Sequence, residues 1–114
     1  MIIFSVDTGH GDLVNEQCRI EVEDVMKELE IPFTICEGCY KGITEVSYCV
    51  PNEYENDVKS FCKDFEQECY LIVLDSLRCF LVYPDKSEYI GKWTKTVSDS
   101  TDYTKIGDEY YVCV

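Results

Sequence analysis

The sequence predicts one α+β domain of the ferredoxin-like class, a βαββαβ sandwich whose antiparallel sheet carries two helices on one face. Two observations predict it. Two stretches with apolar residues at helical spacing, 13–30 and 53–66, alternate with short β-rich runs in that order. The chain has 114 residues, 46% of them hydrophobic, which suits a single core. We assign residues 1–97 to the domain and 98–114 to a C-terminal arm or extra strand.

The first half of the chain supplies four of these elements. Residues 2–6 are β-rich, and a polar loop with two glycines follows at 7–12. The helix at 13–30 has one apolar face, made of Cys18, Val22, Val25, Met26 and Leu29. Strands are expected at 33–42 and 43–50, because β-branched and aromatic residues are frequent there.

The second half begins with the helix at 53–66, where Asn52 and Glu55 resemble a capping box. Its expected buried side chains are Val58, Phe61, Cys62 and Phe65. A hairpin of two apolar strands, "CYLIVLDS" and "RCFLVYPD", comes next, and 88–97 is expected to be an edge strand. Strands that are apolar on both faces need burial on both faces. We therefore expect the open face of the sheet to be covered by self-association.

The charge balance limits the possible partners. Ten basic and 23 acidic residues give a net charge of −13, which argues against direct binding of nucleic acid. It permits a cationic ligand, mimicry of nucleic acid by a carboxylate-covered surface, or solubility alone. No apolar run is long enough to span a membrane, and the N-terminus lacks the basic region of a signal peptide. A cytoplasmic location is expected.

Eight cysteines are consistent with free thiols in a reducing compartment, most of them filling the core. The chain has one C-x-x-C, "CEGC" at 36–39, and one histidine, His10. A zinc site needs further ligands at a matching spacing. The sequence therefore predicts no metal site, while a redox role of Cys36 and Cys39 stays open.

The segment "FEQECYLIV", 65–73, stands where a helix ends and a strand begins. Surface turns at such a place usually carry Gly, Pro, Asn or Asp. Here the chain has Glu66, Gln67 and Glu68 instead. These side chains are candidates to face a ligand.

Four segments, "GCYKG", "FEQECYLIV", "LVYPD" and "IGKWTKTV", resemble the phage-encoded S-adenosylmethionine lyases, formerly called S-adenosylmethionine hydrolases. The resemblance covers about residues 35–97. It implies PII-like trimers of ferredoxin-like subunits that hold S-adenosylmethionine between neighbours, without cofactor or metal. It also implies cleavage to methylthioadenosine and homoserine lactone, which counters host restriction in the cytoplasm of an infected bacterium.

The same resemblance implies the site residues. Glu68 and Tyr40 correspond to catalytic residues, with Glu68 holding the α-amino group and Tyr40 donating a hydrogen bond or stacking on adenine. Glu45, Gln67 and Ser5 are expected to bind substrate. Two alternatives remain open: a protein that sequesters a nucleotide or S-adenosylmethionine without turnover, and an acidic DNA mimic that inhibits a host enzyme.

Overall fold

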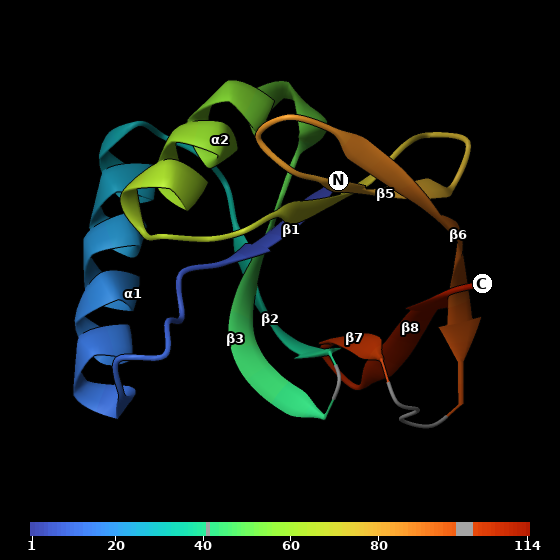
Figure 1. Ribbon diagram of the computed structural model, residues 1–114, viewed down its shortest axis with the longest axis horizontal. Helices are drawn as coiled ribbons and strands as arrows, with labels where there is room; N and C mark the ends of the chain where they lie inside the picture. Colours follow the sequence, from blue (N-terminus) through green and yellow to red (C-terminus); the bar gives the residue numbers. More distant parts are fainter. Residues whose placement is uncertain (41, 98–101) are drawn as a thin grey trace.

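The structure is a computed structural model that describes residues 1–40, 42–97 and 102–114. Within these ranges the chain forms eight β-strands, two α-helices and one 3-10 helix (Figure 1). Their bounds are β1 Ile2–Ser5, α1 Asp12–Glu28, β2 Thr34–Tyr40, β3 Ile43–Val50, η1 Asn52–Tyr54, α2 Glu55–Asp64, β4 Tyr70–Val73, β5 Arg78–Val82, β6 Ser87–Thr96, β7 Tyr103–Ile106 and β8 Glu109–Cys113. Lys41 of the "GCYKG" turn and residues 98–101 of the expected arm lie outside the described residues.

The strands form a closed antiparallel barrel, not an open sheet. Their neighbour order is β1-β3-β2-β7-β8-β6-β5-β4, and β4 pairs back onto β1. The prediction of a ferredoxin-like sandwich is therefore wrong, although the first six α and β elements follow the predicted order. The sheet does not stop after β4: β5, β6, β8 and β7 continue it until β7 pairs with β2. Figure 1 shows the strands arranged around a common interior, with both helices outside them.

Because the barrel is closed, each of the C-terminal strands β6, β7 and β8 has a neighbouring strand on both sides. The expected edge strand 88–97 corresponds to β6, which pairs with β5 on one side and with β8 on the other. Residues 103–113, in the expected arm, contain β7 and β8. A closed sheet leaves no row of unpaired backbone groups at an edge. The hydrogen bonds that close it join parts of the chain far apart in sequence, such as β2 and β7.

The main core lies between the barrel and the two helices. Successive strand residues point to opposite faces, so Ile2 and Phe4 of β1 face the helices while Ile3 faces the barrel interior. The members of this core cluster are Ile2, Phe4, Val6, Val22, Met26, Ile31, Tyr48, Val50, Val58, Phe61, Cys62, Tyr70 and Ile72. The predicted face of α1 is partly confirmed: Val22 and Met26 are fully buried, whereas Val25 and Leu29 are exposed.

The apolar strand β4 is covered on both faces within one chain. Tyr70 and Ile72 belong to the core under the helices. Leu71 and Val73 have the opposite orientation and pair with Leu81 and Cys79 of β5. Burial of the second face therefore comes from the barrel, and it does not require a second copy of the chain.

The C-x-x-C motif lies along β2, so its two side chains point to opposite faces of the strand. Cys36 is buried, and burial raises the pKa of its thiol to about 12. Such a thiol stays protonated at neutral pH and is a poor nucleophile. None of the eight cysteines, which all lie in the described ranges, forms a disulfide. Within the described ranges, no group of three or more His, Cys, Asp or Glu side chains is arranged to hold a metal ion.

Both helices end in the same hydrogen-bonded turn. At the end of α1, Ile31 N donates to Met26 O at 2.8 Å, and at the end of α2, Gln67 N donates to Cys62 O at 2.7 Å. This is the Schellman pattern, which places the residue before each donor in the left-handed region. That residue is Glu30, at φ 59°, in one case and Glu66, at φ 58°, in the other.

The start of the second helix differs from the expectation. Asn52 does not cap it; its side-chain amide donates to Val73 O at 3.2 Å and ties the helix entrance to β4. As for membrane crossing, neither helix in the described part of the chain combines the length and the apolar character that this would need.

Candidate active site

One end of the barrel collects the five residues that the resemblance assigned to the site. The antiparallel registers place the end of β1, the β2–β3 hairpin, the start of β4, the end of β5 and the start of β6 at this end. The predicted residues found on or beside these segments are Ser5, Tyr40, Glu45, Gln67 and Glu68. We call it the acidic end, and we define it by Glu45, Glu68, Cys69, Tyr83 and Glu88.

The groups of the acidic end influence one another electrostatically. Burial raises the pKa of the Cys69 thiol, and the charges of Glu68, Glu45 and Glu88 raise it further, while a hydrogen bond with Tyr83 lowers it. The pKa of the Tyr83 phenol is raised first by Cys69, then by burial, Glu88 and Glu68. Three carboxylates from three strands or junctions therefore surround one thiol and one phenol.

These carboxylates have no cationic partner among the described residues. The ion pairs of 1–40, 42–97 and 102–114 join Arg19 to Asp7, His10 to Glu66 and Lys95 to Glu109. None of them includes a carboxylate of the acidic end. Lys86 lies 5.0 Å from the centre of the Tyr83 ring, as a cation over the aromatic face. The acidic end consequently has negative charge available for a cationic ligand.

Glu45 is held in place through its neighbour in the chain. The Ser5 hydroxyl donates to Val46 O at 2.9 Å, and Val46 N donates to Asp7 Oδ2 at 3.2 Å. The Ser5 oxygen also accepts from Asp7 N at 3.0 Å. Burial, followed by the charge of Asp7, raises the pKa of the Glu45 carboxyl. Ser5 thus anchors the backbone next to Glu45, and its hydroxyl hydrogen is used within the protein.

Asp7 is itself fixed by an arginine from α1. Arg19 Nε and Nη2 donate to the two carboxylate oxygens at 2.8 and 2.7 Å, and the Asp7 side chain is only 8% exposed. A bidentate arginine pair of this kind fixes direction as well as distance. The next residues are tied to the helix by Asn15, whose Oδ1 accepts from Thr8 N at 2.6 Å. The β1–α1 loop is therefore built around a buried polar network.

The "FEQEC" segment joins this loop to α2. The Gln67 side-chain amide donates to Asp7 O at 2.7 Å and to Phe65 O at 3.2 Å. Glu66 occupies the left-handed position of the helix end, and its carboxylate contacts His10 at 3.1 Å. Glu66 and Gln67 therefore serve local structure, and Glu68, which is exposed, is the residue of the three without such a contact in the described part of the chain.

The sequence reasoning missed three members of the acidic end: Cys69, Tyr83 and Glu88. A signal existed for two of them. In a tight antiparallel hairpin with its turn near Asp75–Leu77, Cys69 and Tyr83 come opposite one another at the far end, as the Tyr70–Val82 pair confirms. Glu88 was harder to find, because its place opposite Leu81 depends on the register of the β5–β6 hairpin, which the expected edge strand 88–97 did not define.

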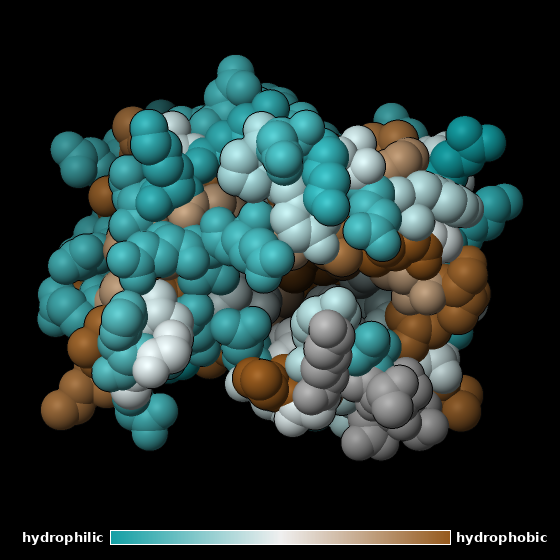
Figure 2. Space-filling view, in the orientation of Figure 1, coloured by the Kyte–Doolittle hydropathy of each residue, from teal (hydrophilic) through white to brown (hydrophobic). Residues whose placement is uncertain are grey.

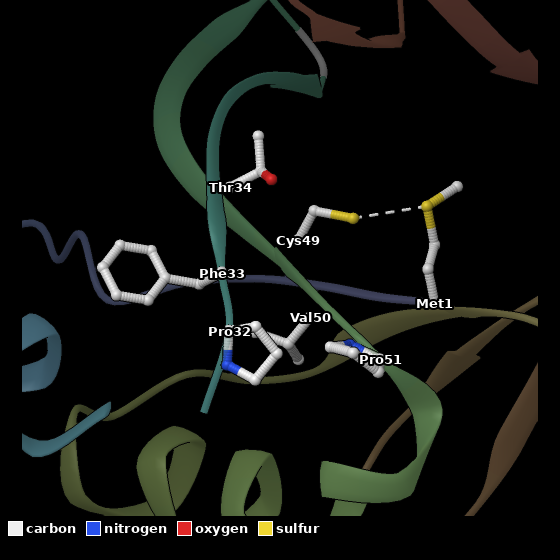
Figure 3. Close-up of a pocket in the computed structure, with 7 residues that line it drawn as sticks. All are labelled: Met1, Pro32, Phe33, Thr34, Cys49, Val50 and Pro51. Atoms are coloured by element: carbon white, nitrogen blue, oxygen red, sulfur yellow. Dashed lines mark hydrogen bonds between the residues drawn. The ribbon is translucent and has the colours of Figure 1, made fainter. Parts of the chain in front are cut away.

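One pocket of the described residues lies away from the acidic end. It is open, has a volume of about 310 Å³ and lies beside Met1 and Cys49, with Phe33 and two prolines around it (Figure 3). Its lining is mostly apolar, and it includes none of the predicted site residues. Figure 2 shows a hydrophilic surface over the helices and a hollow near the middle of the view, over the region that the strands surround in Figure 1.

Carboxylates without cationic partners suit a ligand with positive charge, as a sulfonium with an α-ammonium group has. The sequence matches no curated protein. A family model described as the S-Adenosylmethionine lyase family matches residues 7–114, which is nearly the whole chain and every strand except β1. The chain belongs to the S-adenosylmethionine lyase family.

Proposed function

We propose that the protein is a lyase that cleaves S-adenosylmethionine to methylthioadenosine and homoserine lactone. The observation that carries the proposal is the acidic end: Glu45, Glu68 and Glu88 form no ion pair within the described residues, in a chain of this family. A doubly cationic head group, sulfonium plus ammonium, would be attracted to such a site.

The reaction needs few catalytic groups from the protein, because the substrate contains its own nucleophile and leaving group. The substrate's own carboxylate oxygen attacks the γ-carbon, the carbon–sulfur bond breaks, and its electron pair stays on sulfur as a neutral thioether. Opposite charges cancel as the lactone closes, so moving the substrate out of water favours the transition state. Holding the methionine part bent provides proximity, which is worth roughly 7–11 kcal/mol at best. No proton transfer and no cofactor enter this scheme.

The roles follow from which charges persist. The α-ammonium keeps its charge throughout, whereas the sulfonium loses its charge in the transition state. A carboxylate is therefore most useful on the ammonium, and we assign this contact to Glu68. Tyr40 would donate a hydrogen bond or stack on adenine, and Glu45 would accept from the ribose hydroxyls. Gln67 and Ser5 would act by positioning, because their donors are used in the loop network.

We further propose that the site is completed by a neighbouring copy, in a trimer. Two features support this. Glu68 and Glu88 of the acidic end are exposed in one chain, and the tip of the β2–β3 hairpin beside it exposes large side chains, with Tyr40 55% and Ile43 66% exposed. Light scattering of the purified protein tests the proposal, because a monomer at micromolar concentration would refute it.

In a bacterial cell, consumption of S-adenosylmethionine would disable restriction enzymes that depend on it. The protein would then counter host restriction when a phage carries it. Expression in a host with such a restriction system should raise the plating efficiency of unmodified phage. Expression of an inactive variant should not raise it.

The decisive experiment compares two neighbouring glutamates. Purified Glu68→Gln should produce methylthioadenosine about 100-fold more slowly than wild type, as expected for loss of one electrostatic contact in a catalytic site. Glu66→Gln, two residues away and engaged only with exposed His10, should turn over within about twofold of wild type. Product is measured by chromatography, and light scattering of both variants checks that the assembly is unchanged.

Each outcome has a distinct meaning. Wild-type turnover in Glu68→Gln would refute the assignment of the site. Retention of S-adenosylmethionine by the wild type without methylthioadenosine would refute the lyase proposal and favour sequestration. A wild-type protein that neither binds nor consumes the compound would refute both.

A further inference from the structure

A second pocket, of about 250 Å³, lies on the β5–β6 hairpin and combines two cations with two aromatic rings. It is lined by Arg78, Phe80, Tyr89 and Lys92. We propose that it binds a nucleoside 5′-phosphate, with the phosphate on the two cations and the base on the rings. This inference is independent of the proposed lyase activity.

The two cations are placed against each other. Arg78 and Lys92 are direct partners in the β5–β6 register. Like charges directly opposite on neighbouring strands destabilise a sheet. The chain has 23 acidic and only 10 basic residues, so a carboxylate partner would be easy to supply. Yet neither cation belongs to an ion pair of the described residues. An arrangement that costs stability and lacks an internal anion is suited to an external one.

The backbone contacts of Lys92 leave its charge without an ion-pair partner among the described residues. The backbone of Lys92 exchanges two hydrogen bonds with Val114, at 2.8 and 3.0 Å. These are main-chain bonds that fix the strand, and the Lys92 ammonium forms no ion pair with a carboxylate in the described part of the chain. Both long side chains are exposed and able to reach a ligand.

The rings supply the apolar half of the pocket. Phe80 and Tyr89 are paired in the same register, with their centres 5.5 Å apart and their planes at 56°. Phe80 is half-buried and packs against the main core, so its position is fixed. Tyr89 is 53% exposed, so the face of its ring can contact a ligand. Exposed rings beside cations are the elements with which proteins hold a nucleobase and its phosphate.

The pocket and the acidic end lie on opposite faces of the hairpin. Leu81, which pairs with Glu88, and Cys79 point into the barrel, whereas Phe80 and Arg78 point outward. Glu88 and Tyr89 are consecutive in β6, so their side chains point to the two faces in succession. A ligand here would therefore not occupy the acidic end.

The size and charge of the molecule select the ligand class. The pocket is small, about 250 Å³, so it favours a ligand no larger than one nucleotide over a helix or an extended peptide. A long polyanion would be repelled by the net charge of −13 on the chain. A single phosphate group interacts with the two nearby cations, and more distant charges are screened beyond about 8–10 Å at ordinary ionic strength.

The test uses guanosine 5′-monophosphate as the probe, because a guanine nucleotide does not imitate the adenosine of S-adenosylmethionine. Calorimetry on the full chain should show binding that is weakened about tenfold in Arg78→Gln and in Lys92→Gln, the value of one charge-assisted hydrogen bond. Lys63→Gln, an equal charge change on α2 outside the pocket, should bind as wild type. Thermal melting should show that removal of either like charge leaves the fold as stable or more stable.

Further binding experiments identify which part of the nucleotide the pocket binds. Guanosine without phosphate should bind much more weakly, and excess S-adenosylmethionine should not displace the nucleotide. Amide shifts in NMR spectra should fall on Phe80, Tyr89 and Lys92. Glu68→Gln should bind the probe as wild type, so failure of the lyase proposal leaves this result unaffected.

The proposal is overturned if the probe does not bind at millimolar concentration. It is also overturned if Lys63→Gln weakens binding as much as the pocket variants do, or if guanosine binds equally well. Displacement by S-adenosylmethionine would place the nucleotide at the acidic end instead. Tighter binding of a single-stranded oligonucleotide would replace the small-ligand proposal by nucleic-acid recognition.

Discussion

The buried pair of Asp7 and Arg19 is the polar contact on which the loop next to the acidic end depends. The Asp7 carboxylate accepts from Arg19 Nε at 2.8 Å, from Arg19 Nη2 at 2.7 Å and from Val46 N at 3.2 Å. The side chains are 8% and 29% exposed. We expect Asp7→Asn, Arg19→Gln and the double variant to show strong coupling between the two positions.

The magnitude follows from burial and hydrogen bonding. Removing one partner of a fully buried ion pair costs about 3–5 kcal/mol of the free energy of unfolding. Arg19 is partly accessible to water, and Asn keeps one acceptor for Val46 N, so we expect about 2 kcal/mol for Asp7→Asn. This corresponds to a fall in Tm of roughly 8 °C for a domain of this size. The double variant should lose about 1–2 kcal/mol less than the sum of the single losses.

Urea unfolding of wild type, the two single variants and the double variant, followed by circular dichroism, measures this coupling. Glu16→Gln provides the charge control, because Glu16 is exposed on α1, and its loss should stay within about 0.5 kcal/mol. Additive losses in the double variant would show that the pair does not act as a unit. The claim that this contact positions the loop would then be refuted.

Three further predictions concern the backbone and one titrating group. Gly91→Ala should destabilise the barrel by about 2 kcal/mol or more, because φ is 119° and an added Cβ would lie 2.6 Å from the Val114 backbone; urea unfolding measures it. Glu30→Gly should stabilise the protein by about 0.5–1 kcal/mol, since it relieves a non-glycine residue at φ 59°; its Tm should rise. Glu45→Gln should make unfolding less favourable at neutral pH. Burial raises the pKa of Glu45, so wild type gains stability when this group is protonated and loses it as pH rises through the folded-state pKa.

Each of these predictions has a matched comparison. Gly9→Ala meets no atom within 4 Å and should have little effect, so an equal loss at Gly91 and Gly9 would contradict the steric argument. Glu28→Gly, inside the last turn of α1, should destabilise where Glu30→Gly stabilises. For Glu45→Gln, the advantage over wild type should vanish well below pH 4.5, the ordinary pKa of a glutamate. An advantage that is constant with pH would contradict the titration argument.

The local elements were largely accessible from the sequence. The helices expected at 13–30 and 53–66 are α1 and the pair η1 and α2, with ends displaced by a few residues. Both displaced ends have the same cause. Glu30 and Glu66 occupy left-handed positions that usually carry glycine, so the sequence shows no stop signal where each helix ends.

The candidate site was accessible only in part. Tyr40, Glu45 and Glu68 were singled out by resemblance, and all lie at one end of the barrel. Gln67 and Ser5 lie there too, but their donors bond to backbone carbonyls of the loop network. That distinction depends on which acceptor is within reach, which a linear pattern does not contain.

What the sequence alone determined is local: the composition of one acidic domain, the alternation of strands and helices up to β4, and the membership of a family through short segments. What only the tertiary structure decided is closure. The pairing of β2 with β7 joins Gly38 to Thr104 across most of the chain, and the pairing of β5 with β6 places Glu88 opposite Leu81. Hydrophobic periodicity reports the face on which a residue lies, but not the strand it will meet. The choice between an open sandwich and a barrel depends on those distant registers.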